Sequence, residues 1–91
     1  MKESRVERVL IDEVRKLGGW AVKMAPTVAG LPDRMVLLPD GRVRFVELKT
    51  RGGRLSLIQG VIHRRLAELG HPVTVLWSTD EVRTWVGELD D

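Results

Sequence analysis

The sequence predicts a single α/β domain in which a mixed β-sheet is flanked by helices, with the element order α-β-β-β-α-β-α. Three observations lead to this expectation. Two segments carry apolar residues at helical spacing, a capping signature opens a third helix, and short apolar runs between them are bounded by glycine and proline. The 91 residues have room for one compact domain, residues 1–91. We expect the middle strands to be antiparallel and the last strand to enter after a helical crossover.

The first helix is expected from residue 4 to residue 17, where apolar residues spaced by three, one, four and three are Val6, Val9, Leu10, Val14 and Leu17. Gly18 and Gly19 end this helix. The next expected elements are a strand at 20–24, a Pro/Gly loop at 25–32, a strand at 33–38, a strand at 42–50, a helix at 57–69 and a strand at 73–77. Ser78-x-x-Glu81 has the pattern of a capping box and opens the last helix.

Composition limits the chemistry that the chain can perform. It contains no cysteine, which excludes disulfides and thiolate metal sites. A bound metal would need carboxylates, carbonyl oxygens, water or the two histidines, and this favours a hard cation such as Mg²⁺ or Mn²⁺. There is no signal peptide, long apolar run or lipidation motif, so we expect a soluble, intracellular (cytoplasmic) protein without a membrane partner.

Charged residues are distributed unevenly along the chain. The acidic residues near its C-terminal end are Asp80, Glu81, Glu88, Asp90 and Asp91. The basic residues of its middle part are Arg42, Arg44, Lys49, Arg51, Arg54, His63, Arg64 and Arg65. A local basic surface suits a polyanionic partner, while arginines scattered over a solvated face are an equally good account of the charge alone.

A hairpin between the two middle strands is expected to bring two carboxylates together. If residues 39–41, a Pro-Asp-Gly turn, form the loop, paired positions sum to 80, and Asp33 lies opposite Glu47. Facing residues have Cβ atoms about 4.5–5.5 Å apart, and like charges there destabilise a sheet. A divalent cation between the two groups would relieve the repulsion, because such ions bind several carboxylate, carbonyl and water oxygens.

Two further charged residues are expected near this pair. Strand alternation places Lys49 on the same face as Glu47, where a lysine can orient water or stabilise charge on a phosphate. On the first helix, Glu7 falls within the apolar arc, where a carboxylate is costly unless it is paired or bound to a cation. Glu3 lies on the same side but close to the terminus, so we rank it second.

Gln59 has two roles open to it. It follows ten residues after Lys49, and His63 lies one turn further along the same helix face. Ser56-x-x-Gln59 is also a capping box, in which the glutamine reaches back to the N-cap amide. The two roles are compatible with each other.

These residues together resemble the PD-(D/E)XK nuclease superfamily, and most closely its small stand-alone VRR-NUC domains of viruses and bacteria. The resemblance rests on Glu7, the Gly-Leu-Pro-Asp string that ends at Asp33, the Glu-Leu-Lys string at residues 47–49, and Gln59. It covers essentially the whole chain. It implies a restriction-endonuclease-like core and a Mg²⁺- or Mn²⁺-dependent endodeoxyribonuclease that hydrolyses phosphodiester bonds.

The resemblance also implies particular roles. The implied metal ligands are Asp33, Glu47, the backbone carbonyl of Leu48, and Glu7. Lys49 would be the catalytic lysine and Gln59 a catalytic-motif residue at the edge of the site. The stand-alone members of the family look like homodimeric Holliday-junction resolvases, so the implied substrate is a four-way junction or other branched DNA, in recombination or repair.

Some residues keep a simpler interpretation beside the functional one. The residues that we expect to contact DNA are Arg51, Arg54, His63 and Arg64; the loop around Gly52 could instead be ordinary. We expect His63 to be a surface or DNA-facing residue rather than a ligand. Asp33 alone could be a turn residue and Glu7 a solvated one. The three tryptophans are expected in the core or at a dimer interface, and not as stacking platforms for bases.

Three other functions remain open from the sequence. A non-catalytic DNA-binding module on a nuclease fold would bind DNA without metal-dependent cleavage. A flap nuclease, another structure-specific nuclease or a restriction subunit would differ in its preferred substrate. An interaction protein that uses its tryptophans at an interface would have a partner but no affinity for DNA.

Overall fold

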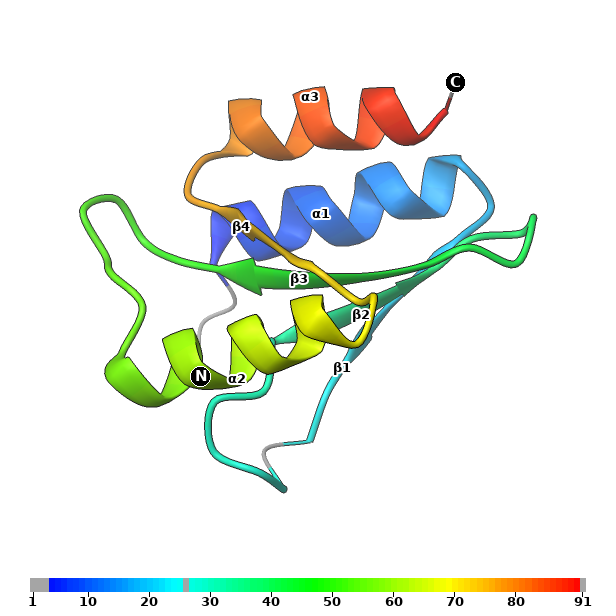
Figure 1. The fold of residues 1–91 in the computed structure, drawn as a ribbon. Coiled ribbons are helices and arrows are strands. Elements are labelled where there is room, and N and C mark those ends of the chain that lie inside the picture. Colours follow the sequence, from blue (N-terminus) through cyan, green and yellow to red (C-terminus); the bar gives the residue numbers. More distant parts are fainter. Residues whose placement is uncertain (1–3, 26, 91) are drawn as a thin grey trace.

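The computed structural model describes residues 4–25 and 27–90, and its elements follow the predicted order. The elements are α1 (Arg5–Lys16), β1 (Trp20–Lys23), β2 (Arg34–Leu37), β3 (Val43–Leu48), α2 (Leu57–Glu68), β4 (Val73–Leu76) and α3 (Thr79–Leu89). Helices α1 and α3 lie side by side on one side of the sheet, and α2 lies on the other (Figure 1). The fold class predicted from the sequence is therefore confirmed.

The four strands form one mixed sheet in the order β1-β2-β3-β4. The pairs β1–β2 and β2–β3 are antiparallel, whereas β4 joins β3 in parallel after the crossover through α2. This is the arrangement expected for three sequential strands followed by a helical connection.

The register between β2 and β3 follows the rule derived from the turn. Arg34 pairs with Val46, and Leu37 pairs with Val43, so paired positions sum to 80. At the turn, the amide of Leu38 donates to the carbonyl of Arg42 at 3.0 Å, and Gly41 adopts a positive φ of 92°. Continuing this register by one pair places Asp33 opposite Glu47.

Both strands are shorter than expected, for reasons at their ends. The amide of Arg42 donates to the side chain of Asp40 instead of entering the ladder, so β3 begins one residue later than expected. At the other end, the amide of Leu48 donates to the carboxylate of Asp33 at 2.9 Å. Asp33 therefore lies one residue before β2 and contributes its side chain to the pairing.

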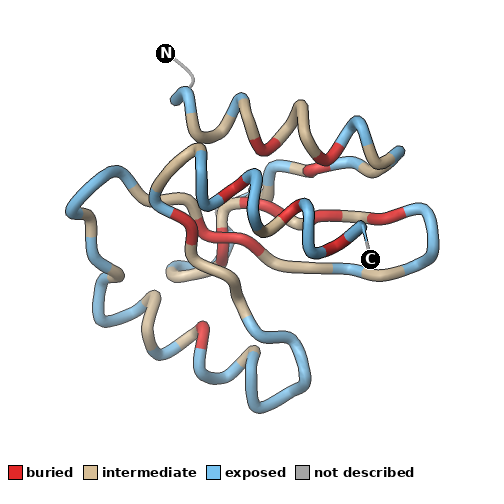
Figure 2. The backbone as a smooth tube through the Cα atoms, turned by 90° about the horizontal axis from the view of Figure 1, so that it is seen from above, coloured by how far each residue is buried: buried red, intermediate tan, exposed pale blue. Residues whose placement is uncertain are grey.

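The hydrophobic core lies on only one face of the sheet. Its buried residues are Leu10, Val14, Ala21, Val36, Leu38, Val46, Leu76, Val82, Val86 and Leu89, from α1, α3 and the strands between them. In Figure 2 the buried segments follow the sheet, α1 and α3, while α2 carries a single one. That residue is His63. The opposite face of the sheet, which α2 covers, carries half-buried apolar residues such as Met35 and Phe45 beside Glu47.

Serine caps begin all three helices. Ser4, Ser56 and Ser78 each accept a hydrogen bond from the amide three residues later. The capping box predicted for α2 is complete, with Gln59 bonding back to the amide of Ser56. At α3 the serine cap is present, but Glu81 accepts from the amide of Trp77 rather than from that of Ser78.

The three tryptophans have different environments. Trp85 packs against the core, as expected, whereas Trp20 is 67% exposed and Trp77 is 37% exposed. Among the helices of the described ranges, none is long and apolar enough to cross a membrane.

Candidate active site

Asp33 and Glu47 form the centre of the candidate site, on the sheet face that α2 covers. Glu47 is only 2% exposed, although it carries a carboxylate. Burial, followed by the negative charge of Asp33, raises the pKa of Glu47 to about 7, and the nearby Lys49 opposes part of this rise. The repulsion expected between two facing carboxylates is therefore present in the folded protein.

The backbone carbonyl of Leu48, at the end of β3, lacks the hydrogen-bond donor that the neighbouring strand would normally supply. In the register of β2 and β3, residue 32 would pair with Leu48 and donate its amide hydrogen to the Leu48 carbonyl. Residue 32 is a buried proline and has no such hydrogen. The amide of Lys49 bonds to β4, so the Leu48 carbonyl of the same trans peptide points the other way, toward Asp33.

Gln59 joins the helix cap to the charged residues of β3. Its side-chain oxygen accepts from Lys49 Nζ at 2.8 Å and from the amide of Ser56 at 2.9 Å. Its side-chain nitrogen donates to Glu47 Oε2 at 3.2 Å, and Lys49 Nζ lies 3.6 Å from the same oxygen. One amide therefore caps α2 and also fixes the positions of Lys49 and Glu47, so both geometries considered for Gln59 occur together.

His63 lies inside the molecule and not on the surface as expected. It is 9% exposed, and its Nε2 atom faces Glu47 Oε1 at a distance of 3.8 Å. Burial, followed by the positive charge of Lys49, lowers the pKa of His63. Its proposed contact with DNA stays a prediction, but its position places it beside the carboxylate pair.

Glu7 pairs with a cation of the protein itself. Its carboxylate lies 2.9 Å from Nη2 of Arg34, and Nη1 of the same guanidinium donates to the backbone oxygen of Ala21. The sequence contained a signal for Glu7, which falls within the apolar arc of the helix, but none that identified Arg34 as its partner. A role for Glu7 as a metal ligand stays a prediction, and the second-ranked Glu3 lies outside the described residues.

The arginines expected to contact DNA are exposed. Arg51 and Arg54 lie in the loop between β3 and α2, and Arg64 lies on the outer side of α2. Within the loop, the amide of Gly53 donates to the carbonyl of Thr50 at 2.7 Å. The indole of Trp77 donates to the carbonyl of Gly53 at 2.8 Å, a contact that the sequence did not predict. This loop is thus fastened to the end of β4.

The oxygen atoms of the site suit a hard divalent cation, but the carboxylates alone are too few to coordinate it, and a backbone carbonyl and water would have to complete the set. Among the described residues, no three histidine, aspartate or glutamate side chains form a group that could hold a metal by themselves. Glu47 Oε1 and His63 Nε2 are nevertheless buried without a hydrogen-bond partner in this part of the chain. A cation here would draw on Asp33, Glu47, the Leu48 carbonyl and water, a donor set that fits Mg²⁺ or Mn²⁺.

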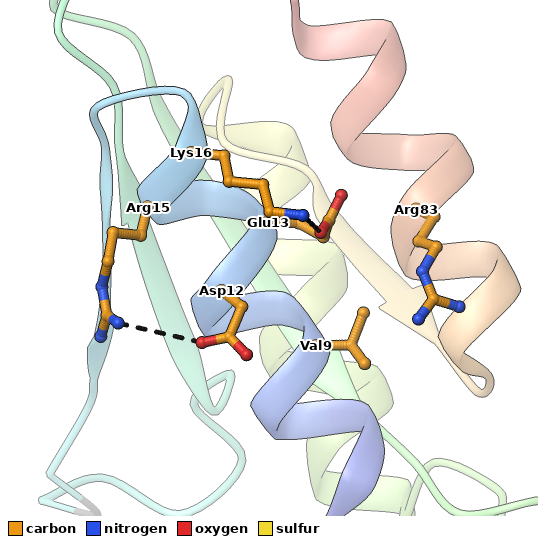
Figure 3. A pocket seen from close by; sticks show the side chains of 6 residues that line it. All are labelled: Val9, Asp12, Glu13, Arg15, Lys16 and Arg83. Atoms are coloured by element: carbon orange, nitrogen blue, oxygen red, sulfur yellow. Dashed lines mark hydrogen bonds and ion pairs between the residues drawn. The ribbon is translucent and has the colours of Figure 1, made fainter.

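A depression of about 480 Å³ lies away from this site, between α1 and α3 (Figure 3). Its charged residues pair along α1, with Lys16 2.8 Å from Glu13 and Arg15 3.9 Å from Asp12. It borders the helices that cover the other face of the sheet from Glu47. The carboxylate pair, and not this depression, is therefore the candidate active site.

Pro32 and Asp33 directly before β2, and a Glu-Leu-Lys string at residues 47–49 on the neighbouring strand, lie side by side in a mixed sheet between helices. This is the arrangement of a PD-(D/E)XK nuclease. No protein-family model matches the chain. A curated protein of Acyrthosiphon pisum secondary endosymbiont phage 1, named "Putative nuclease p44", is 46% identical over 81 residues, which cover 88% of this chain and 87% of that protein. A solved structure described as a VRR_NUC domain superposes with a TM-score of 0.83 at 29% identity, covering 91% of each chain. The chain belongs to the VRR-NUC family of nuclease domains, and it is a nuclease.

Proposed function

We propose that this nuclease is a metal-dependent, structure-specific DNA endonuclease, and that it resolves four-way (Holliday) junctions as a homodimer. The observation that carries the proposal is the buried Glu47 carboxylate, which faces Asp33 on one side and has one oxygen without a hydrogen-bond partner among the described residues. A folded protein tolerates this arrangement when a cation completes it.

The residues of the site have different roles in phosphodiester hydrolysis. Asp33, Glu47 and the Leu48 carbonyl would hold Mg²⁺ or Mn²⁺, which supplies charge neutralisation at the phosphate and a more acidic water. Gln59 holds the ammonium group of Lys49 beside Glu47. From there the ammonium group stabilises negative charge that develops on the phosphate oxygens.

Two surface features support a DNA substrate and a second copy of the chain. The exposed arginines Arg51 and Arg54 lie in the loop that follows Lys49, and Arg64 follows His63 on α2; such exposed guanidinium groups suit contacts with backbone phosphates. On α2, the apolar side chains of Leu57 and Val61 are 92% and 60% exposed. A two-fold dimer would cover them and present two sites to the two equivalent strands of a junction.

The test is cleavage of a labelled four-way junction, beside a flap and a linear duplex, in Mg²⁺, Mn²⁺ or EDTA. Lys49→Ala and Asp33→Asn are the test variants. Lys16→Ala and Asp80→Asn are their matched controls, because both side chains are exposed and lie on α1 and α3, which cover the other face of the sheet. We expect paired, symmetric nicks that need metal, persist in the controls and fall by at least about 100-fold in the test variants.

Other outcomes would assign a different function. Preferred cutting of the flap or the duplex would keep the metal-dependent nuclease and replace the resolvase. Salt-dependent junction binding without cutting in either metal would favour the non-catalytic DNA-binding module.

A further inference from the structure

His63 and Glu47 present two buried polar atoms to each other between α2 and the sheet. The distance from His63 Nε2 to Glu47 Oε1 is 3.8 Å, and neither atom has a hydrogen-bond partner within the described part of the chain. The two side chains are only 10% and 3% exposed. A buried polar atom without a hydrogen-bond partner destabilises the fold, so two such atoms that face each other favour a group that bridges them.

The other oxygen of the same carboxylate is already engaged. Gln59, one helical turn before His63, donates to Glu47 Oε2. Lys49 also lies on the Oε2 side, at 3.6 Å. Glu47 Oε1 is therefore the oxygen left for an additional ligand, and α2 brings the imidazole to that oxygen.

The separation of the two atoms fits a shared cation better than a direct hydrogen bond. A direct N–H···O hydrogen bond has a donor–acceptor distance of about 2.7–3.2 Å. A first-row divalent cation binds imidazole nitrogen and carboxylate oxygen at roughly 2.0–2.2 Å, so two of its ligands can lie up to about 4.3 Å apart. The observed 3.8 Å lies within this limit.

We propose that His63 Nε2 is a nitrogen ligand of the divalent cation bound at Glu47, and that it raises the affinity of the site for first-row transition cations relative to Mg²⁺. The inference rests on the proposed metal dependence of the nuclease. Its chemical basis is that imidazole suits transition cations, whereas Mg²⁺ prefers a shell made only of oxygen.

The test uses Mn²⁺ as a spectroscopic probe of its own ligands. Electron spin-echo envelope modulation of Mn²⁺ bound to the intact protein detects a coordinated ¹⁴N nucleus directly. The chain has only two histidines, so His71→Asn is a matched control for His63→Asn. His71 is exposed and contacts the ring of Phe45, away from the carboxylate pair. Labelling the histidines of the unchanged protein with ¹⁵N gives the same information without any substitution.

We expect a ¹⁴N modulation that disappears on ¹⁵N-histidine labelling and in His63→Asn, and that persists in His71→Asn. The dissociation constant of Mn²⁺, measured from its free electron paramagnetic resonance signal, should rise on the order of tenfold or more in His63→Asn, and that of Mg²⁺ should rise less. Stoichiometric Mn²⁺ without histidine modulation would overturn the role of His63 and leave the proposed nuclease standing. Metal-independent cleavage without Mn²⁺ binding would overturn both.

Discussion

The side-chain amide of Gln59 connects the first turn of α2 to the two charged residues of β3. Its oxygen accepts from Ser56 and Lys49, and its nitrogen donates to Glu47. We therefore expect removal of the amide to affect both stability and catalysis, and a substitution of the cap residue that leaves the amide in place separates the two effects.

We expect Ser56→Ala to lower the free energy of unfolding by about 1 kcal/mol while nuclease activity is retained. Gln59→Ala should cause a similar loss of stability and, in addition, a fall in kcat of up to about 100-fold, because Lys49 loses the group that positions it. Urea denaturation and single-turnover cleavage measure the two effects. Equal activity of the two variants would show that Gln59 serves only as a cap.

The raised pKa of Glu47 makes a prediction for the metal-free protein. Burial and the charge of Asp33 raise this pKa from 4.5 to about 7, so the folded chain keeps a proton that the unfolded chain releases. The contribution of Glu47 to the free energy of unfolding is therefore full below about pH 4.5, and it is lost as the pH rises through about 7. The shift in pKa corresponds to a change of about 3 kcal/mol in the free energy of unfolding.

Urea denaturation in EDTA between pH 5 and pH 8 tests this effect. The unfolding free energy of the unchanged protein should fall with pH over this range, and Glu47→Gln should flatten the fall. Asp80→Asn, which alters a side chain that is 97% exposed, should leave the profile as it is. Parallel profiles for the unchanged protein and Glu47→Gln would contradict the prediction.

At the scale of the elements, the residue that precedes β2 determines whether the last carbonyl of β3 is hydrogen-bonded. Pro32 cannot donate to the Leu48 carbonyl, so that oxygen stays available beside Asp33. Pro32→Ala restores the amide hydrogen, which can then bond to the carbonyl.

We expect Pro32→Ala to weaken Mn²⁺ binding about fivefold, because the competing hydrogen bond has a net value near 1 kcal/mol. The measurement is a Mn²⁺ titration of the folded variant, with Pro39→Ala in the exposed turn as the control. An unchanged affinity in a variant that circular dichroism shows to be folded would mean that the carbonyl is not a ligand.

Local patterns were sufficient to predict most of the elements and part of the site. The Pro-Asp-Gly turn fixed the hairpin register, and hence the juxtaposition of Asp33 and Glu47, because a turn of known length determines which residues pair. The Ser56–Gln59 box was predictable for the same local reason. The burial of His63 was not, because the orientation of α2 depends on what the sheet offers it.

The face of the sheet under α2 presents two charged groups, Glu47 and Lys49, among half-buried apolar residues such as Met35, Phe45 and Val75. Glu47 and Lys49 attract the helix face that carries Gln59 and His63, and apolar residues such as Val61 are left outward. The pairing of Glu7 with Arg34 was hidden for a related reason. It joins residues far apart in the sequence, and no local pattern specifies such a contact.

At the scale of the whole molecule, the core is one-sided and the first two turns of α2 expose apolar side chains. Leu57 and Val61 are one helical turn apart, and Ile58 between them is 47% exposed. A domain of this size buries only about 60–65% of its unfolded surface. A second copy that packs on α2 would cover these side chains and add to a limited core.

We therefore expect the protein to sediment as a dimer, and Leu57→Glu or Val61→Glu to convert it to a monomer. Each change introduces a charge at a position that is already exposed in the single chain, so the fold of the monomer should tolerate it. Val28→Glu, at a residue 52% exposed in the loop before β2, is the matched control and should remain dimeric. On a four-way junction the monomeric variants should make single nicks where the unchanged protein makes symmetric pairs, since each copy brings one site. The dimer measured by analytical ultracentrifugation and the paired nicks measured by junction cleavage should be lost in the same variants. A monomeric unchanged protein, or dimers that survive both substitutions, would remove α2 as the dimer surface.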